Sequence, residues 1–272
     1  MSTKIQTIPG EELWGERKFE VDALYASRLG SIRIWCKMTA DEFWLGHLYD
    51  SPNTVDFESV DELPDDLVWS RWALKPTFQT ILFSPIFPDR SVVAKPESPF
   101  RLTPGVQTKI YVRVPIWIQI YLAGKEPILI EELPTVVLSN TWFGGFTDGE
   151  LCYWISTNAF RHVEPDPDRL NSAVCPIRIT NKSEDELLVE KLRLPVEGLS
   201  LYLQEGQLWA NETTVSFRGQ KEESQIDVVR KPPKEAENAK LAAQSRTPVK
   251  RGLRAKTFES LKNLPGLGFL PS

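Results

Sequence analysis

The chain has 272 residues, of which 41% are hydrophobic and 25% charged, so it is long enough and apolar enough to bury a core of its own. Its 9 Trp and 21 Pro exceed the ordinary globular composition and suit a β protein with many loops. No window reaches the roughly 18 apolar residues of a transmembrane segment, and the formal net charge of −5 argues against a nucleic-acid-binding body.

The N-terminus and the cysteines predict the compartment. Residues 1–10 lack the apolar segment of a secretory signal, so we expect a cytoplasmic protein. Cys36, Cys152 and Cys175 lie in strand-like runs without a Cys-x-x-Cys pair. We therefore interpret them as small buried hydrophobic residues, and we expect no metal site, no disulfide and no cofactor.

Residues 1–75 are predicted to form an N-terminal β-rich lobe. Apolar side chains alternate in three runs, at 19–23, 32–38 and 43–45, which is typical of a three-stranded β-meander. The acidic segment 50–76 predicts a loop or short helix that caps a sheet. It also marks the boundary with the next domain.

The longest strand signal lies between Lys109 and Ala123. Every even position from Ile110 to Leu122 is aliphatic, whereas the odd positions carry polar and aromatic side chains, among them Trp117 and Tyr121. This period of two predicts one long strand, with one face for a core and the other for a mixed aromatic and polar surface.

Residues 76–229 are predicted to form an antiparallel, immunoglobulin-like β-sandwich. Prolines interrupt an expected edge strand within 80–96, where a missing backbone donor is tolerated. Many short strands separated by turns follow, which is typical of a sandwich. They are expected at 128–130, 135–138, 150–157, 175–180, 187–194, 199–203, 213–218 and 225–229.

Residues 230–272 are predicted to form a basic, flexible tail. Residues 230–262 contain ten basic and three acidic residues, a net charge of +7, which leaves −12 on the rest of the chain. Few aromatic or β-branched residues are present, so the tail cannot fold alone. Good helix formers predict one helix within 234–245, and Thr257 is expected to cap a second.

The tail ends in an apolar hook. A hydrophobic terminus on a polar tether favours an apolar groove, which belongs to its own domain, to a partner or to another subunit; a membrane surface is a further alternative. The oligomeric state is left open. The hook residues are Phe258, Leu261, Leu267, Phe269 and Leu270.

The most distinctive local sequence runs from Ser139 to Trp154. Its three glycines permit positive backbone dihedral angles, and its aromatic residues supply contact area, so the first interpretation is a tight turn between strands. The alternative is a binding loop, in which glycine allows close approach of a ligand. Its binding residues would be Trp142, Phe143, Asp148 and Glu150.

Catalytic motifs are not recognisable in the sequence. His47 and His162 are more than a hundred residues apart, and neither has a nucleophile or carboxylate at a known spacing. The acidic stretch 162–168 lacks the spacing of a calcium loop and is interpreted as a solvated loop. A pair of carboxylates that converges only in the fold stays open as the basis of a hydrolase.

Several short motifs resemble an uncharacterised family, the domain of unknown function 432, over roughly residues 10–220. The resemblance implies no activity, cofactor or catalytic residue; it implies association with small mechanosensitive channels and so favours a membrane-associated partner. The motifs are 102–105 (Leu-Thr-Pro-Gly), 110–112 (Ile-Tyr-Val), 115–118 (Pro-Ile-Trp-Ile), 134–135 (Pro-Thr), 141–144 (Thr-Trp-Phe-Gly), 149–153 (Gly-Glu-Leu-Cys-Tyr) and 175–177 (Cys-Pro-Ile).

Three functions are compatible with these observations. The first is a non-catalytic accessory module that binds another protein through the surface around Trp117 and Tyr121, or through the Trp142 loop, with the hook as a second contact. The second is a carbohydrate or small-ligand module on the same aromatic surface. The third is a hydrolase, which requires carboxylates with raised pKa values in a deep pocket.

Overall fold

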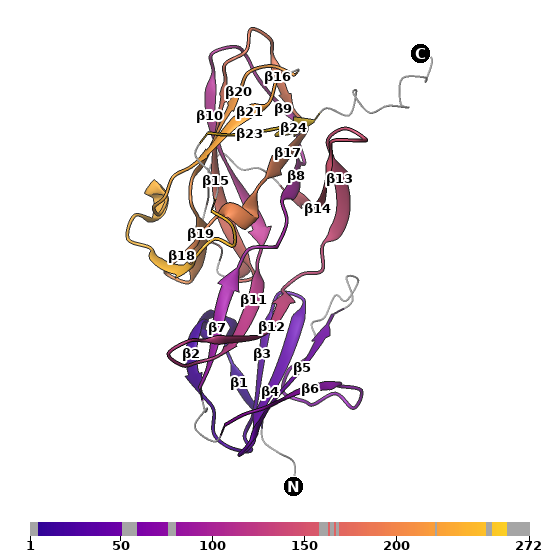
Figure 1. Ribbon diagram of the computed structural model, residues 1–272, viewed down its shortest axis with the longest axis vertical. Helices are drawn as coiled ribbons and strands as arrows, with labels where there is room; N and C mark the ends of the chain where they lie inside the picture. Colours follow the sequence, from indigo (N-terminus) through magenta and orange to yellow (C-terminus); the bar gives the residue numbers. More distant parts are fainter. Residues whose placement is uncertain are drawn as a thin grey trace. The chain divides into compact units, whose positions relative to one another are not determined.

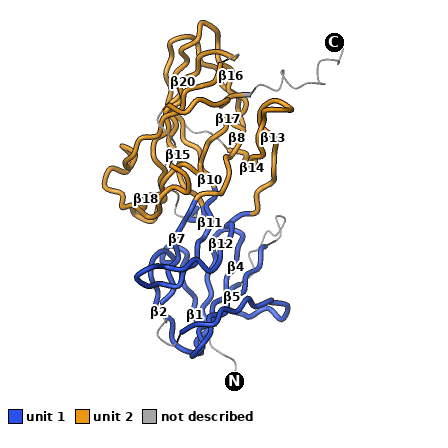
Figure 2. The backbone as a smooth tube through the Cα atoms, in the orientation of Figure 1, with its two compact units in different colours: residues 1–86, 115–136, 167–171 blue, residues 87–114, 137–166, 172–272 orange. Residues whose placement is uncertain are grey.

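The computed structural model describes residues 5–50, 59–75, 80–157, 163, 166, 169–220, 222–248 and 252–259. This part of the chain is mainly β-strand (Figure 1), and none of its helices has the length or apolar character needed to span a membrane. Two compact units are formed (Figure 2): unit 1 has residues 1–86, 115–136 and 167–171, and unit 2 has residues 87–114, 137–166 and 172–272. The domain borders expected at residues 75 and 229 stay predictions, since the units are defined by internal contacts and not by independent folding.

Unit 1 contains two β-sheets, with strand orders β1-β3-β4-β5-β6 and β12-β11-β7-β2. Its described strands are β1 (Ile5–Ile8), β2 (Gly15–Lys18), β3 (Leu24–Leu29), β4 (Ile32–Met38), β5 (Glu42–Tyr49), β6 (Trp69–Ala73), β7 (Thr80–Ile86), β11 (Trp117–Leu122) and β12 (Ile128–Pro134), and η1 (Gly10–Glu12) is a 3-10 helix of the same unit.

An antiparallel meander runs through β3, β4 and β5, as the alternating pattern predicts, and continues into β6. The meander begins at Leu24 and not at Phe19, whose ring instead enters the core. That core takes buried side chains from both sheets of the unit, among them Ile34 and Phe43 from the first and Phe83 and Ile118 from the second. Burial of this shared apolar surface is the main force that stabilises unit 1.

The alternating run between Lys109 and Ala123 forms two strands instead of the single strand that was expected. β10 (Gln107–Pro115) ends where β11 begins, and the residue between them, Ile116, is fully buried with both of its backbone groups bonded to unit 1. Its N–H donates to the carbonyl of Asn171 at 3.0 Å, and its carbonyl accepts from the N–H of Thr135 at 3.1 Å. The predicted burial is confirmed for the even positions from 110 to 120, each at most 2% exposed, whereas Leu122 is only partly buried.

Unit 2 contains three β-sheets. The largest has the order β22-β18-β19-β15-β20-β21-β23, with β10 also paired to β15; the second has the order β13-β14-β8-β17-β24, and β16 pairs with β9. The strands are β8 (Val92–Pro96), β9 (Phe100–Leu102), β10, β13 (Ser139–Phe143), β14 (Glu150–Thr157), β15 (Ser172–Asn181), β16 (Leu187–Val189), β17 (Lys191–Leu194), β18 (Leu201–Gln204), β19 (Gln207–Ala210), β20 (Thr213–Phe217), β21 (Ser224–Val228), β22 (Lys240–Ala243), β23 (Leu253–Ala255) and β24 (Phe258–Glu259), with the 3-10 helices η3 (Val196–Gly198) and η4 (Lys234–Ala236).

The sheets of unit 2 are mixed, although an antiparallel arrangement was expected. β15 pairs in parallel with both β19 and β20, and β14 pairs in parallel with β8. Parallel neighbours require connections that cross over, and the alternation of side chains along a strand carries no information about such distant pairings.

The prediction of a helical tail was wrong for the residues that the structure describes. Only a single 3-10 turn, η4, forms in 234–236, and residues 240–243 form β22, which pairs with β18. Ala236 and Ala239 are buried beside Tyr202, so packing on the sheet overrides the helix propensity of this segment. The second expected helix is replaced at its start by β24, which pairs with β17; residues 260–272, which include Leu261, Leu267, Phe269 and Leu270, lie outside the described part.

Substitution on the two faces of β11 tests this fold. Ile118→Ala removes a fully buried side chain from the core of unit 1 and should lower the free energy of unfolding by about 2–5 kcal/mol. Gln119→Ala, on the opposite face, should cost about 1 kcal/mol or less, since it removes only partly exposed hydrogen bonds. Urea unfolding of both variants measures the difference, and equal losses would contradict the assigned burial.

Candidate functional site

A hairpin made by β13 and β14 presents apolar side chains to solvent. Trp142 and Leu151 are cross-strand neighbours on one face of this hairpin and are 51% and 47% exposed. Phe146, in the turn, is 93% exposed, and Val137, just before β13, is 66% exposed. We call residues 137–151 the aromatic hairpin. Exposed apolar side chains therefore recur along the length of this hairpin.

The turn of the aromatic hairpin fixes the indole ring of Trp142. The indole N–H donates to the carbonyl of Gly145 at 2.9 Å, and the backbone N–H of Gly149 donates to the same carbonyl at 2.8 Å. Gly144 has a φ of 103°, which side chains rarely tolerate, and a Cβ at Gly149 would collide with the indole nitrogen. The predicted tight turn is thus also a support that holds an exposed aromatic side chain.

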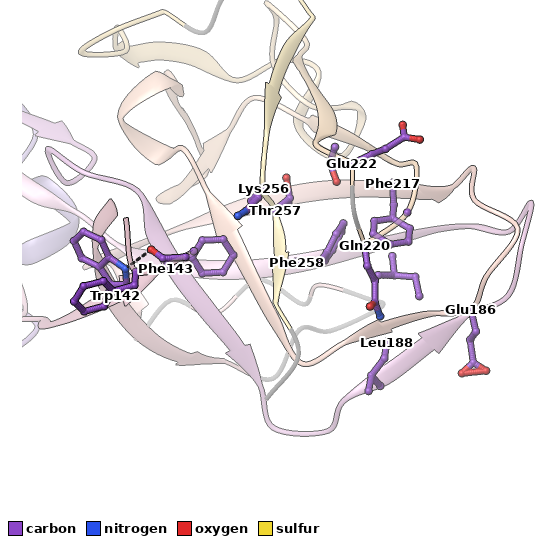
Figure 3. Close-up of a pocket in the computed structure, with 16 residues that line it drawn as sticks. Trp142, Phe143, Glu186, Leu188, Phe217, Gln220, Glu222, Lys256, Thr257 and Phe258 are labelled. Carbon is purple, nitrogen blue, oxygen red and sulfur yellow. Dashed lines mark hydrogen bonds between the residues drawn. The ribbon is translucent and has the colours of Figure 1, made fainter. Parts of the chain in front are cut away.

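Beside this turn lies a cavity of about 520 Å³, which we call the aromatic cleft. Figure 3 shows Trp142 and Phe143 at one end and Phe217 and Phe258 in the middle, with Leu188 beyond them. The rings of Phe217 and Phe258 meet edge to face, with centroids 5.7 Å apart. The apolar lining residues are Trp142, Phe143, Phe146, Leu187, Leu188, Phe217 and Phe258.

Three acidic residues around the hairpin and the cleft bind basic side chains of the same unit. Asp148 accepts from Lys256 at 2.9 Å, and this contact lowers the pKa of the Asp148 carboxyl. Glu150 accepts from Arg193, also at 2.9 Å, and Glu186 accepts from Arg101 at 2.6 Å. Asp148 and Glu150 therefore connect the hairpin to strand β17 and to the segment between β23 and β24.

The residues predicted for a binding surface fall into two separate groups. Trp142, Phe143, Asp148 and Glu150 belong to the aromatic hairpin of unit 2, although Phe143 is buried. Trp117 and Tyr121 lie on β11 of unit 1 and are half-buried, and the hydroxyl of Tyr121 donates to Gln119 at 2.8 Å. A role for Trp117 and Tyr121 in binding stays a prediction.

Other buried or partly buried titratable groups lie in both units. Glu197 accepts from the hydroxyl of Ser91 at 3.1 Å, and burial raises the pKa of its carboxyl. Burial raises the pKa of the Cys152 thiol to about 12. It also raises the pKa values of the Cys36 and Cys175 thiols. All three cysteines are buried and free, and the described residues contain no cluster that could hold a metal ion.

Sequence reasoning found the hairpin but not the wall of the cleft. Phe217 ends β20 and Leu187 begins β16, and no local signal connects these strands with Trp142. Phe258, expected in a flexible hook, is instead part of β24 and lines the cleft. His162 lies outside the described residues.

The family described as "Protein of unknown function (DUF432)" matches residues 13–262, which include nearly all of both units. No curated protein and no solved structure matches the chain. The comparisons therefore identify a family without supplying an activity.

Gly149→Ala tests the support under Trp142. The new methyl group should displace the indole ring and shift its N–H resonance in an NMR spectrum of the nine tryptophans, where Trp142→Phe identifies the signal. Gln220→Ala is the control, because Gln220 lines the same cleft but its side chain is exposed. An unmoved Trp142 resonance in Gly149→Ala would refute the assigned turn.

The partly buried Glu197 should make stability depend on pH. Because burial raises its folded-state pKa above the unfolded value, the native state binds more protons between the two values, and stability falls as the pH rises through this window. Glu197→Gln removes the cost of burying a charge and should be more stable than the natural protein at pH 7, with a smaller advantage at pH 4. Unfolding at both pH values, with the exposed Glu237→Gln as control, measures this; a constant difference would contradict it.

Proposed function

Because the chain belongs to the DUF432 family, whose description assigns no function, we propose from its geometry that it is a non-catalytic module that binds another protein through the aromatic hairpin. The observation that carries this proposal is the exposure of Val137, Trp142, Phe146 and Leu151 on one hairpin of unit 2. Large apolar side chains gathered on a surface mark interaction sites, and aromatic residues among them supply most of the binding energy.

The exposed side chains of the aromatic hairpin are preorganised for binding. Phe146 is almost fully exposed, so its burial by a partner would contribute on the order of 2 kcal/mol from the hydrophobic effect. Trp142 is already held by its bond to Gly145, so less side-chain entropy is lost when it is covered. The adjacent aromatic cleft offers a concave apolar surface for a side chain of the partner. The expected partner is therefore a protein with an apolar segment that covers the hairpin and inserts into the cleft.

A carbohydrate site is supported less well by the same contacts. Sugars require polar groups that are placed to bind hydroxyls beside an aromatic platform. Here the indole N–H of Trp142 is used by Gly145, and Asp148 and Glu150 bind Lys256 and Arg193. Trp142 thus lacks free polar neighbours among the residues first considered for such a site.

A hydrolase is also supported less well. A carboxylate that serves as a general acid needs a raised pKa and access to a substrate. The pKa of Asp148 is lowered instead, and Glu197, whose pKa is raised, does not line the aromatic cleft. Neither residue combines the two requirements.

Two further expectations accompany the proposal. We propose that the protein acts in the reducing cytoplasm, which fits its three free, buried cysteines. We also propose that its partner is a membrane-associated protein. An immunoglobulin-like arrangement within residues 76–229 is a proposal that rests on the antiparallel pairs β18–β19 and β20–β21; the parallel pairs of β15 count against it.

Site-specific photo-crosslinking in cells tests the proposed function. A photoreactive phenylalanine analogue at Phe146 should capture a specific protein from the soluble or the membrane fraction, whereas the same analogue at Val68, 82% exposed in unit 1, should not. With the captured protein purified, Phe146→Ser should weaken binding by about tenfold or more, and Val68→Ser should change it less than twofold.

Phe146→Ser is preferred to Trp142→Ala because the Phe146 side chain is exposed and its loss should leave the fold intact. Equal capture at both positions, or unchanged affinity of Phe146→Ser, would overturn the proposal. Glycan binding by the natural protein that Trp142→Ala abolishes would favour the carbohydrate alternative instead.

A further inference from the structure

A second cavity of unit 2, of about 470 Å³, has a different chemistry from the aromatic cleft. Among its twelve described lining residues there are two basic side chains, Arg230 and Lys231, and no carboxylate. Both basic side chains are exposed, and within the described part of the chain neither forms an ion pair. This contrasts with the basic residues around the hairpin, which bind acidic partners.

The buried side chain of Asn211, 3% exposed, organises the wall of this cavity. Its amide nitrogen donates to the carbonyl of Val229 at 2.8 Å and lies 3.4 Å from the carbonyl of Lys231, which fixes the turn that carries the two cations. Its amide oxygen accepts from the backbone N–H of Ser200 at 2.7 Å. One buried amide thus holds two segments of the wall in place.

The same network leaves hydroxyl hydrogens available to a ligand. The hydroxyl of Tyr202 accepts from the amide of Asn211 at 3.1 Å, and the hydroxyl of Ser200 accepts from the backbone N–H of Ser245 at 3.2 Å. Because each oxygen acts as an acceptor in these bonds, each hydroxyl keeps its own hydrogen for donation. The polar groups of the cavity are therefore mainly donors, beside two positive charges.

We infer that this cavity binds a phosphate monoester, with the phosphate on Arg230 and Lys231 and on the hydroxyls of Ser200 and Tyr202. A phosphate monoester carries a charge of about −1.5 to −2 at pH 7 and three acceptor oxygens, which match two cations and two donors better than a carboxylate does. The cavity is larger than a phosphate group, and Pro232, Leu241 and Pro248 provide an apolar wall for an organic body. A soluble metabolite and a lipid headgroup share this chemistry.

Calorimetry with the full chain tests the inference, using phenyl phosphate and inorganic phosphate as probes at constant ionic strength. Phenyl phosphate should bind with one site per chain, inorganic phosphate should bind at least threefold more weakly because it lacks the apolar body, and chloride should not compete. Absence of saturable binding of both phosphates, or equal competition by chloride, would overturn the inference.

Variants locate the bound phosphate. The double variant Arg230→Gln, Lys231→Gln should lower the affinity for phenyl phosphate at least tenfold, and Tyr202→Phe should lower it about threefold. Lys234→Gln removes a neighbouring exposed charge that does not line the cavity, so it should stay within twofold of the natural protein. If Lys234→Gln weakens binding as much as the double variant, the attraction is only a general charge effect and the inference fails.

Vesicles separate the two sources of the phosphate. Sedimentation with phosphatidylcholine vesicles that contain phosphatidic acid, but not with pure phosphatidylcholine vesicles, and its loss in the double variant would support a lipid-borne phosphate. Binding of phenyl phosphate without vesicle binding would support a soluble ligand. Phe146→Ser should leave both measurements unchanged, so this inference and the proposed protein-binding function can fail independently.

Discussion

The constraint on which the structure depends is the burial of apolar side chains along the strands of a mainly β protein. The clearest case is the run from Ile110 to Ile120, whose even positions are all nearly inaccessible to solvent although they contribute to two different units. Shifting either strand by one residue would expose every aliphatic side chain and bury the polar ones. Register is therefore fixed by hydrophobic burial, and the loops between strands are positioned by that register.

Fixed registers explain how short loops acquire defined surfaces. β13 and β14 pair so that Trp142 stands opposite Leu151, and the glycine-rich turn between the strands closes around the indole ring. A similar effect operates at the end of β21, where the bonds of Asn211 hold the turn that carries Arg230 and Lys231. In both places hydrogen bonds within the protein already hold the exposed groups in position, so little reorganisation is needed on binding.

Strand positions could be predicted from the sequence because a period of two is a local signal, whereas strand neighbours could not. The alternation from Ile110 onward identified the buried face, but nothing in it indicated that Ile116 is held by Asn171, more than fifty residues away. In segment 234–245 the local signal itself predicted the wrong structure. Its residues favour a helix, but pairing of β22 with β18 overrides that propensity. The glycines around Trp142 revealed the hairpin, while Phe217, the opposite wall of the cleft, lacked any comparable local mark.

The distribution of charge in unit 2 separates structural from available groups. Lys109 binds Glu212 and Glu235, each at 2.6 Å, and Arg178 binds Glu212 at 2.8 Å, so the basic residues of this network are neutralised by their own fold. The acidic residues of the aromatic hairpin, Asp148 and Glu150, are likewise paired with basic side chains of their own fold. Against this background, two cations on a fixed turn without a carboxylate in their cavity are not needed to hold the fold together. Apolar attraction at the hairpin and electrostatic attraction at the cavity also respond oppositely to salt, because screening weakens only the second. The two surfaces are therefore chemically suited to different ligands, and occupation of one does not require the chemistry of the other.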